Sequence, residues 1–136
     1  MRFSSKIAIV IRDDLATWQR LNITAFLASG VAGGVPDVMG QPYLDGDGVE
    51  YLPMLRQPVL VFAADGPELT RTRERAAARG LRIAVYTEDL FATGNDADNR
   101  AAVASVPTDK LNLVGLALYG PRNDVDKVLK GLSLHA

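Results

Sequence analysis

The segment TEDLFATGN, residues 87–95, gathers many of the side chains that could perform chemistry. It holds hydroxyls, carboxylates, an amide and a glycine, and it follows the apolar run LRIAVY at 81–86. Open α/β sheets place their ligand crevices at the carboxyl ends of buried strands. We therefore expect this segment to form one wall of a binding site. A well-hydrogen-bonded structural loop is the alternative interpretation.

A second polar segment follows the apolar run KIAIVIR at 6–12. Asp13 and Asp14 stand between this run and a helical pattern, where a catalytic pair and a helix cap are both conceivable. Asp14 is placed to accept the free amide hydrogens of the first helical turn and to face the positive end of the helix dipole. Such a cap contributes about 1 kcal/mol. We expect the two aspartates to end the strand and cap the helix.

The start of that helix is expected to supply the opposite wall of the crevice, because the first strand ends there as well. Trp18, Asn22 and Thr24 are the nearest candidates, although a single aromatic on an apolar helical stripe usually packs into the core. The predicted ligand contacts are Asp14, Trp18, Asn22, Thr87, Asp89, Gly94 and Asn95.

Several kinds of catalysis lack the residues they need. The chain has no cysteine, which excludes thiolate nucleophiles and disulfides, and its one histidine is His135, which argues against triads and histidine metal sites. Aspartates could offer oxygen ligands to Mg²⁺ or Ca²⁺, but the run Asp45-Gly-Asp-Gly48 lacks the remaining acids of a calcium loop. We expect no metal and no cofactor. The aspartates considered are Asp45, Asp47, Asp89, Asp96 and Asp98.

Length and composition indicate one soluble domain spanning residues 1–136. Hydrophobic residues make up 48% of the chain, charged residues 23%, and the net charge is -1. The longest apolar runs reach about ten residues, short of the roughly 20 that a bilayer span needs. No signal-peptide pattern is seen, so we expect a cytoplasmic protein without a membrane partner.

Apolar runs at 6–12, 57–65, 81–86 and 111–120 predict four strands, alternating with helices. This pattern predicts a three-layer α/β/α sandwich with a mixed sheet, in which the third and fourth strands can be antiparallel. Residues 37–55 predict a hairpin or irregular flap, and one helical turn is expected within 99–106. The helix after Asp14 is expected to bury the stripe Leu15, Trp18, Leu21, Ala25 and Ala28.

Arg71, Arg75 and Arg79 recur every four residues on one face of the helix expected after Asp65. A basic stripe can follow a phosphate backbone, so a nucleic acid such as tRNA is a possible partner. The slightly acidic chain and the frequency of arginines on solvated helix faces favour an ordinary wet face.

The motifs KIAIV, TWQ-LN, TEDLFATGN and LVGLALYGP resemble those of an uncharacterised bacterial family, a domain of unknown function, over almost the whole chain. The C-terminal half, with QPVLVFAAD, GLRIAVYTED and GLALYGPRNDVDKVLKGLSL, is also similar to type II peptidyl-tRNA hydrolase. This resemblance implies the hydrolase-like fold, a mixed four-stranded α/β/α sandwich, without establishing an activity.

The hydrolase resemblance implies site residues only where positions match. Its aspartate after the third strand corresponds to Glu88 and its threonine to Thr93. The lysine, glutamine and histidine of its first helix fall on Leu21, Ala25 and Ala28, which cannot donate a proton or polarise an ester. The resemblance thus implies a rim that keeps its carboxylate and lacks its cationic partners, although Arg20 lies one position away.

Two functions follow. In the first, the protein is a binding module without catalysis, expected to form a homodimer, that takes a small molecule or a partner in the crevice. In the second, it is a divergent hydrolase in which Glu88 acts as acid or base and Thr93 or Thr87 positions the substrate.

Overall fold

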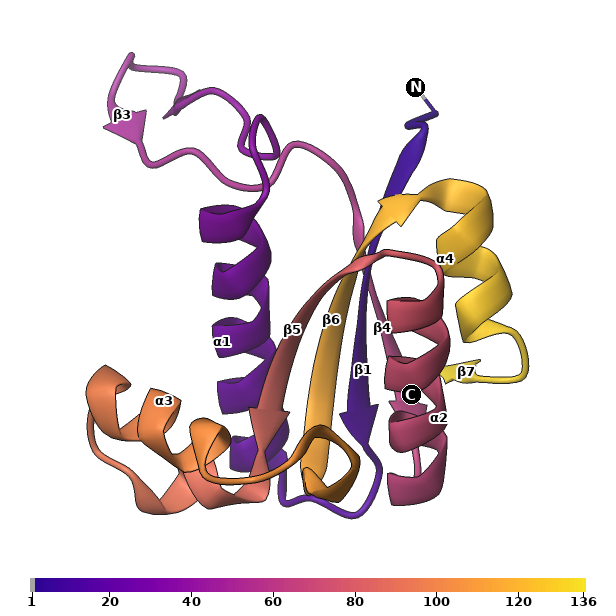
Figure 1. Ribbon diagram of the computed structural model, residues 1–136. Helices are drawn as coiled ribbons and strands as arrows, with labels where there is room; N and C mark the ends of the chain where they lie inside the picture. Colours follow the sequence, from indigo (N-terminus) through magenta and orange to yellow (C-terminus); the bar gives the residue numbers. More distant parts are fainter. Residues whose placement is uncertain (1) are drawn as a thin grey trace.

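The computed structural model describes residues 2–136, whose main strands form one mixed sheet in the order β5-β6-β1-β4-β7 (Figure 1). β1 and β4 are parallel, and every other pair of neighbours is antiparallel. The four predicted strands and the antiparallel pairing of the last two are confirmed, whereas the short β7 was not predicted. The strands are β1 (Ser5–Arg12), β4 (Val59–Ala64), β5 (Arg82–Thr87), β6 (Leu113–Pro121) and β7 (Ser133–Leu134).

Helices cover both faces of this sheet. α1 lies against one face and α2 and α4 against the other, while α3 lies beside the start of α1 (Figure 1). The short 3₁₀ helix η1 leads from β5 toward α3, and η2 precedes β6. No helix formed by residues 2–136 is both long and apolar enough to cross a membrane. The bounds are α1 (Thr17–Gly34), α2 (Gly66–Ala78), η1 (Glu88–Ala92), α3 (Asp96–Ala104), η2 (Thr108–Lys110) and α4 (Arg122–Leu129).

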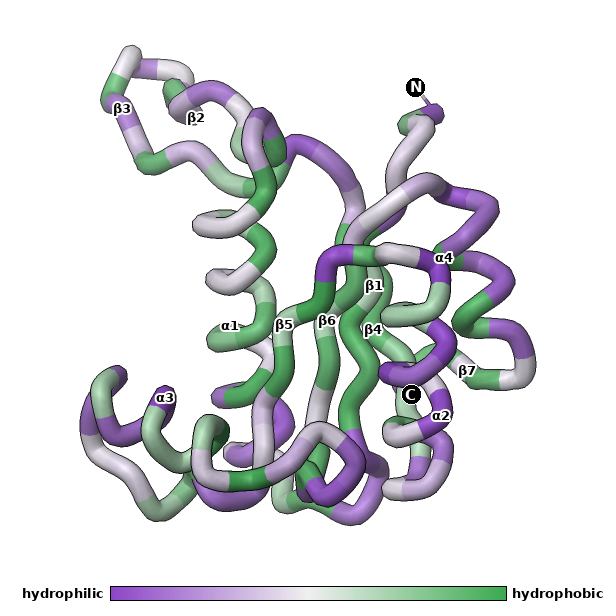
Figure 2. The backbone as a smooth tube through the Cα atoms, in the orientation of Figure 1, coloured by the Kyte–Doolittle hydropathy of each residue, from purple (hydrophilic) through white to green (hydrophobic). Residues whose placement is uncertain are grey.

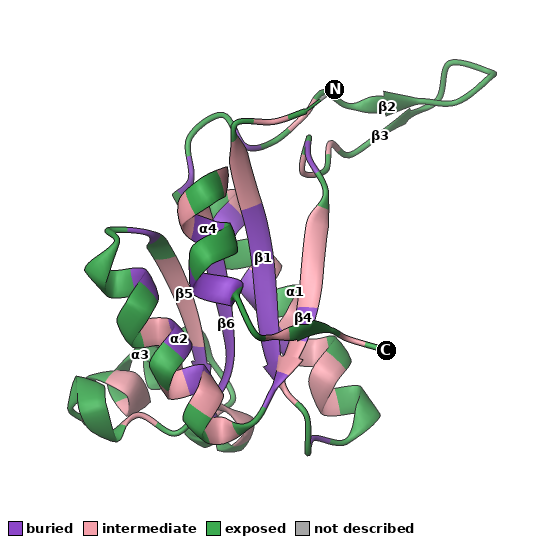
Figure 3. Cartoon of the chain, turned by 90° about the vertical axis from the view of Figure 1, so that its right-hand side faces the viewer, coloured by how far each residue is buried: buried purple, intermediate pink, exposed green. Residues whose placement is uncertain are grey.

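β1 forms the centre of the fold because its side chains are apolar on both faces (Figures 2 and 3). Ile7, Ile9 and Ile11 point into the core beneath α1, and Ala8 and Val10 point into the core beneath α2 and α4. Full burial of a large aliphatic side chain contributes about 1.5–3 kcal/mol. β1, near the N-terminus, also pairs with β6, which is near the C-terminus.

The register with β6 runs from Ser5 opposite Pro121 to Ile11 opposite Gly115. A Cβ on Gly115 would lie 2.8 Å from Leu27 Cδ1, so only glycine lets α1 approach the sheet this closely.

The buried stripe of α1 differs from the predicted one. Ile23, Leu27 and Val31 face the sheet, whereas Trp18 and Leu21 are 62% and 69% exposed. Residues 21–36 contain no charged side chain, so both faces of the helix are apolar and periodicity alone did not identify the buried one.

Asp14 does not cap α1, and that prediction is wrong. The N-cap is Ala16, whose backbone N–H donates to Gln19 Oε1 at 3.0 Å. The helix begins two residues later than the cap would require, and Asp14 instead accepts a hydrogen bond from Arg12.

The predicted start of α2 is confirmed. Glu68 N donates to Asp65 Oδ1 at 2.8 Å, and Asp65 N donates to Glu68 Oε1 at 2.9 Å, which completes a capping box. Arg71, Arg75 and Arg79 lie on the exposed side of this helix as expected.

Residues 38–56, which we call the arm, project from the body of the molecule (Figures 1 and 3). The arm is an antiparallel hairpin of β2 (Tyr43–Leu44) and β3 (Glu50–Tyr51), as the sequence predicted. Asp45 holds its tip by accepting hydrogen bonds from two backbone amides and from the Tyr51 hydroxyl. The Tyr51 hydrogen bond keeps the pKa of the Asp45 carboxyl below its ordinary value.

Candidate functional site

A hollow of about 330 Å³ opens where the first half of α1 faces η1 and the start of α3. We call it the aromatic pocket. Five of the predicted ligand contacts or catalytic residues line it, and they come from both of the predicted walls. The lining residues are Trp18, Asn22, Phe26, Tyr86, Leu90, Phe91, Thr93, Gly94, Asn95, Asp96 and Asn99.

The helix wall of the pocket follows from the period of α1. Trp18, Asn22 and Phe26 are spaced by four residues and therefore share one side of the helix. The opposite wall forms where the chain leaves β5. The register between β5 and β6 shifts between Tyr86 and Thr87, and η1 then carries Leu90 and Phe91 toward α1.

Aromatic rings in edge or tilted contact form the apolar part of the wall. The centroids of Trp18 and Phe91 lie 5.9 Å apart at an interplanar angle of 70°. Tyr86 contacts Phe91 at 5.3 Å and Phe26 at 5.8 Å, with tilted rings. Pairs of this geometry contribute about 0.5–1.5 kcal/mol beyond the burial of their surface, so these contacts stabilise the wall.

Hydrogen bonds hold the polar part of the pocket. Asn22 Nδ2 donates to the Tyr86 hydroxyl at 3.5 Å, and Thr93 Oγ1 donates to Leu90 O at 2.9 Å and contacts Asn99 Oδ1. Asn95 Oδ1 accepts from Asp98 N at 2.9 Å and so caps α3. Thr93 and Asn95 therefore shape the loop with their side chains, as the structural interpretation of this segment expected.

Burial raises the pKa of the Tyr86 hydroxyl above its ordinary value, and the Asn22 hydrogen bond opposes part of this shift. The hydroxyl is therefore protonated near neutral pH and able to donate.

Three polar groups on the pocket wall have no hydrogen-bond partner among residues 2–136. They are the indole N–H of Trp18, the Oδ1 of Asn22 and the Nδ2 of Asn99. Two of them donate and one accepts. The only charged side chain on the wall, Asp96, forms an ion pair with Arg100. The pocket thus combines aromatic surface with a few neutral hydrogen-bonding groups.

A second hollow of about 510 Å³ adjoins the aromatic pocket and shares Phe26, Tyr86 and Asn99 with it. It continues along β5 past Ala84 to Gly30 of α1. A Cβ on Gly30 would lie 3.0 Å from Ala84 Cβ, so this glycine lets α1 and β5 approach closely. Together the two hollows provide room for a ligand longer than the aromatic pocket alone would accept.

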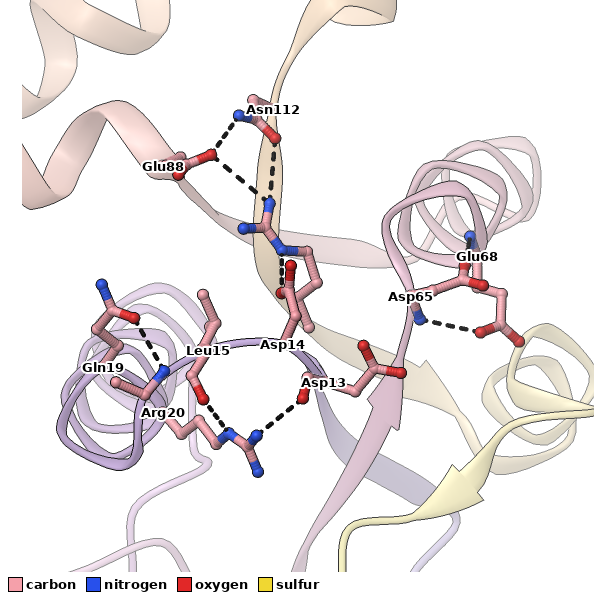
Figure 4. A network of polar contacts seen from close by, with 11 residues as sticks. Asp13, Asp14, Leu15, Gln19, Arg20, Asp65, Glu68, Glu88 and Asn112 are labelled. Atoms are coloured by element: carbon pink, nitrogen blue, oxygen red, sulfur yellow. Dashed lines mark hydrogen bonds and ion pairs between the residues drawn. The ribbon is translucent and has the colours of Figure 1, made fainter.

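Glu88 belongs to a different cluster, the Arg12 network of Arg12, Asp14, Glu88 and Asn112 (Figure 4). Arg12 Nε donates to Asp14 Oδ1 at 2.6 Å, and Arg12 Nη1 donates to Asn112 Oδ1 at 3.3 Å. Asn112 Nδ2 donates to Glu88 Oε2 at 2.6 Å, and the Arg12 guanidinium lies 3.7 Å from the same oxygen. These contacts tie the end of β1 to the start of η1 and to the residue before β6.

The expectation that the rim has no cation beside Glu88 is therefore wrong. The sequence places Arg12 at the end of a strand, and nothing in it shows that residue 12 and residue 88 meet across β6. The first helix, where the hydrolase carries its basic residues, supplies no cation beside Glu88. Leu21 is exposed, and Arg20 donates to the carbonyls of Asp13 and Leu15 and contacts His135.

The remaining predicted residues lie outside the aromatic pocket. Thr87 is buried, and its Oγ1 has no hydrogen-bond partner among residues 2–136. Asp89 is exposed in the first turn of η1, and Asp14 is held by Arg12. The structure therefore separates Glu88, in the Arg12 network, from Thr93, in the aromatic pocket.

Within residues 2–136, no three histidine or acidic side chains come close enough together to hold a metal ion. Asp45 of the DGDG run is occupied by the backbone amides and the tyrosine at the tip of the arm.

Sequence reasoning missed Phe26, Tyr86 and Phe91, since aromatic residues in apolar runs are normally read as core. A signal was present for Phe26, which lies four residues beyond Asn22 on the helix that was already assigned to the site.

The fold and the pocket define a small mixed α/β protein with an aromatic-walled hollow beside an edge of its sheet. Residues 5–136 match a family described as protein of unknown function (DUF2000), and the chain belongs to this family. The solved structure of the protein of unknown function Atu0240 from Agrobacterium tumefaciens strain C58 is similar over 99% of this chain and 100% of that chain. It has 44% sequence identity and a TM-score of 0.95. A comparison with curated proteins gives no match.

Proposed function

We propose that the protein is a small-molecule binding module whose site is the aromatic pocket. The observation that carries this proposal is the set of unpaired polar groups of Trp18, Asn22 and Asn99 on a wall that is otherwise aromatic. Ligand sites commonly combine apolar walls with a few placed polar groups, and they occupy about 300–1,000 Å³.

The same groups indicate the class of ligand. The unpaired groups are neutral, and the one carboxylate on the wall, that of Asp96, is paired with Arg100. A charged ligand would lose its hydration without gaining an opposite charge. A neutral molecule with a flat ring and an amide fits better, because its carbonyl can accept from Trp18 or Asn99 and its N–H can donate to Asn22.

Trp18 offers a direct measurement, because it is the only tryptophan of the chain and lies on the pocket wall. Titration with nicotinamide and benzamide should change its fluorescence and saturate. Nicotinate and benzoate are matched in shape but carry a negative charge, and they should bind at least about tenfold more weakly, a difference of about 1.4 kcal/mol. Saturation by the acids with no response to the amides would contradict the proposed ligand class. No saturable response to any of these compounds would contradict the site.

A divergent hydrolase is the second candidate, and the Arg12 guanidinium beside Glu88 is the observation that favours it. This function has less support. Glu88 already accepts a hydrogen bond from Asn112, and the Thr93 hydroxyl already donates one to Leu90 O within its own loop. Release of peptide from peptidyl-tRNA that disappears in both Glu88→Ala and Arg12→Ala would support the hydrolase. Release that persists in both variants would exclude this pair as its site.

A further inference from the structure

Exposed apolar side chains are concentrated on α1 and the arm. Of the eleven large apolar side chains that residues 2–136 leave exposed, ten lie there and only Leu134 lies elsewhere. Leu52, near the end of the hairpin, is 84% exposed. The ten are Trp18, Leu21, Phe26, Met39, Tyr43, Leu44, Val49, Tyr51, Leu52 and Met54.

This area is too large for an ordinary solvated surface. At roughly 100 Å² for each half-exposed large side chain, the seven on the arm alone offer on the order of 700 Å². The largest apolar patch on a typical monomer measures about 300–600 Å², whereas each partner of a stable interface buries about 800 Å². An isolated two-stranded hairpin is also marginally stable in water, so an arm of this kind gains stability when another surface covers it.

The outer face of α1 lacks charged residues, as surfaces buried in an interface usually do. Residues 21–36 include no Asp, Glu, Lys or Arg, although Leu21, Ala25 and Ser29 face solvent. Near the end of the helix, Gly33 and Gly34 leave open space where side chains would stand. Solvated faces of helices normally carry charged residues.

The arm is long enough to cover most of the helix. The 18 residues of α1 span about 27 Å. One side of the arm, residues 39–45, spans about 20 Å before the turn that Asp45 holds. Because the arm begins just beyond the end of α1, it projects away from the Trp18 end of its own helix (Figure 1).

We propose that a second copy of this chain covers these surfaces in a two-fold dimer. The two α1 helices run antiparallel, and the arm of each copy lies along the outer face of the other copy's α1. Each chain carries one arm and one uncovered helix face of comparable length, so a reciprocal contact covers both surfaces on both chains. A partner that fits only the arm or only the helix face would leave the other surface in water.

Analytical ultracentrifugation at about 50 µM tests the proposal, since an interface with a Kd near 1 µM is mostly formed at that concentration. The wild type should sediment as a dimer. The double variant L44D/L52D should sediment as a monomer with an unchanged far-UV circular dichroism spectrum. L134D, which places a single aspartate on the exposed leucine of the edge strand β7, should remain a dimer.

A third variant distinguishes contact between arm and helix from contact between two arms. L21D alters only the outer face of α1 and should weaken the dimer at least about tenfold. A monomeric wild type, or a dimeric L44D/L52D, would overturn the proposal, and an unweakened L21D dimer would overturn the assigned helix contact. If the far-UV circular dichroism spectrum shows that L44D/L52D is unfolded, the neutral variant L44S/L52S takes its place. It is also expected to be a monomer. None of these leucines lines the aromatic pocket, so the test is independent of ligand binding.

Discussion

The Arg12 network and the aromatic pocket both involve η1 and the residues around it, yet they have opposite properties. In the Arg12 network, Arg12, Glu88 and Asn112 bind one another, and the Arg12 side chain is only 16% exposed. In the aromatic pocket, Trp18 and Asn22 keep polar groups that no other described residue uses. Both clusters contain residues of the types that catalyse or bind. The two clusters differ in whether those groups are already paired, and this difference is why we propose the aromatic pocket as the binding site.

Arg12→Ala tests the structural half of this comparison and should have the largest effect on stability. It removes hydrogen bonds to Asp14 and Asn112 and leaves the Glu88 carboxylate without its cation. We expect a loss of about 2 kcal/mol, reduced from the value for buried pairs because the carboxylates are half exposed. Thermal unfolding should show Tm lowered by about 6–8 °C. Benzamide affinity should stay within about twofold of the wild-type value, and a larger fall would mean that the network belongs to the binding site.

Phe91→Leu tests the aromatic half. Leucine keeps an apolar side chain but removes the ring that contacts Trp18 and Tyr86. Ring pairs of this kind contribute about 0.5–1.5 kcal/mol, so the Kd for benzamide should rise about fivefold to tenfold. Fluorescence titration of Trp18 measures the change. Unchanged affinity would show that the ligand does not use this wall.

Asn22→Ala should have a smaller effect on binding. It removes the unpaired Oδ1 and the hydrogen bond to Tyr86, each a neutral interaction of about 1 kcal/mol. Titration should show a roughly fivefold weaker affinity for amide ligands. Asn123→Ala removes an exposed amide on α4 and serves as the matched control, which should bind as the wild type does. Equal behaviour of the two variants would remove Asn22 from the site.

The smallest expected effect concerns the ionisation of Tyr86. Burial holds the pKa of this hydroxyl above 10.0, so the fold favours the protonated form. The resulting stability is fully present below pH 10 and is lost as the pH rises through the raised pKa. Between pH 9 and 11, Tm should therefore fall more steeply for the wild type than for Tyr86→Phe. Parallel curves would show that Tyr86 is not buried enough to titrate differently in the folded state.

Much of the fold was predictable because its strongest signals are local. The apolar runs at 6–12 and 111–120 became β1 and β6, and the Asp65 and Glu68 pair began α2 as expected. β7 has only two residues and depends on β4 for its hydrogen bonds, so the sequence offered no periodic signal for it.

The site was predictable in part for a similar reason. Trp18, Asn22 and Thr93 follow from the rule that ligands bind at strand ends, and they do line one hollow. The meeting of Arg12 with Glu88 depends on which strands are neighbours, which the sequence did not reveal. The exposed side of α1 could not be assigned, because the helix has no charged side chain beyond Arg20 and so shows no charged face over most of its length.

The register of β1 has a consequence for synthesis of the protein. Ser5 pairs with Pro121, so β1 cannot acquire this antiparallel neighbour until β6, about 100 residues later, has been translated. Until then its isoleucines and valine need protection from other nascent chains, and chaperones that hold apolar segments are the expected source. Expression at low temperature, which slows aggregation more than translation, should therefore raise the yield of folded protein.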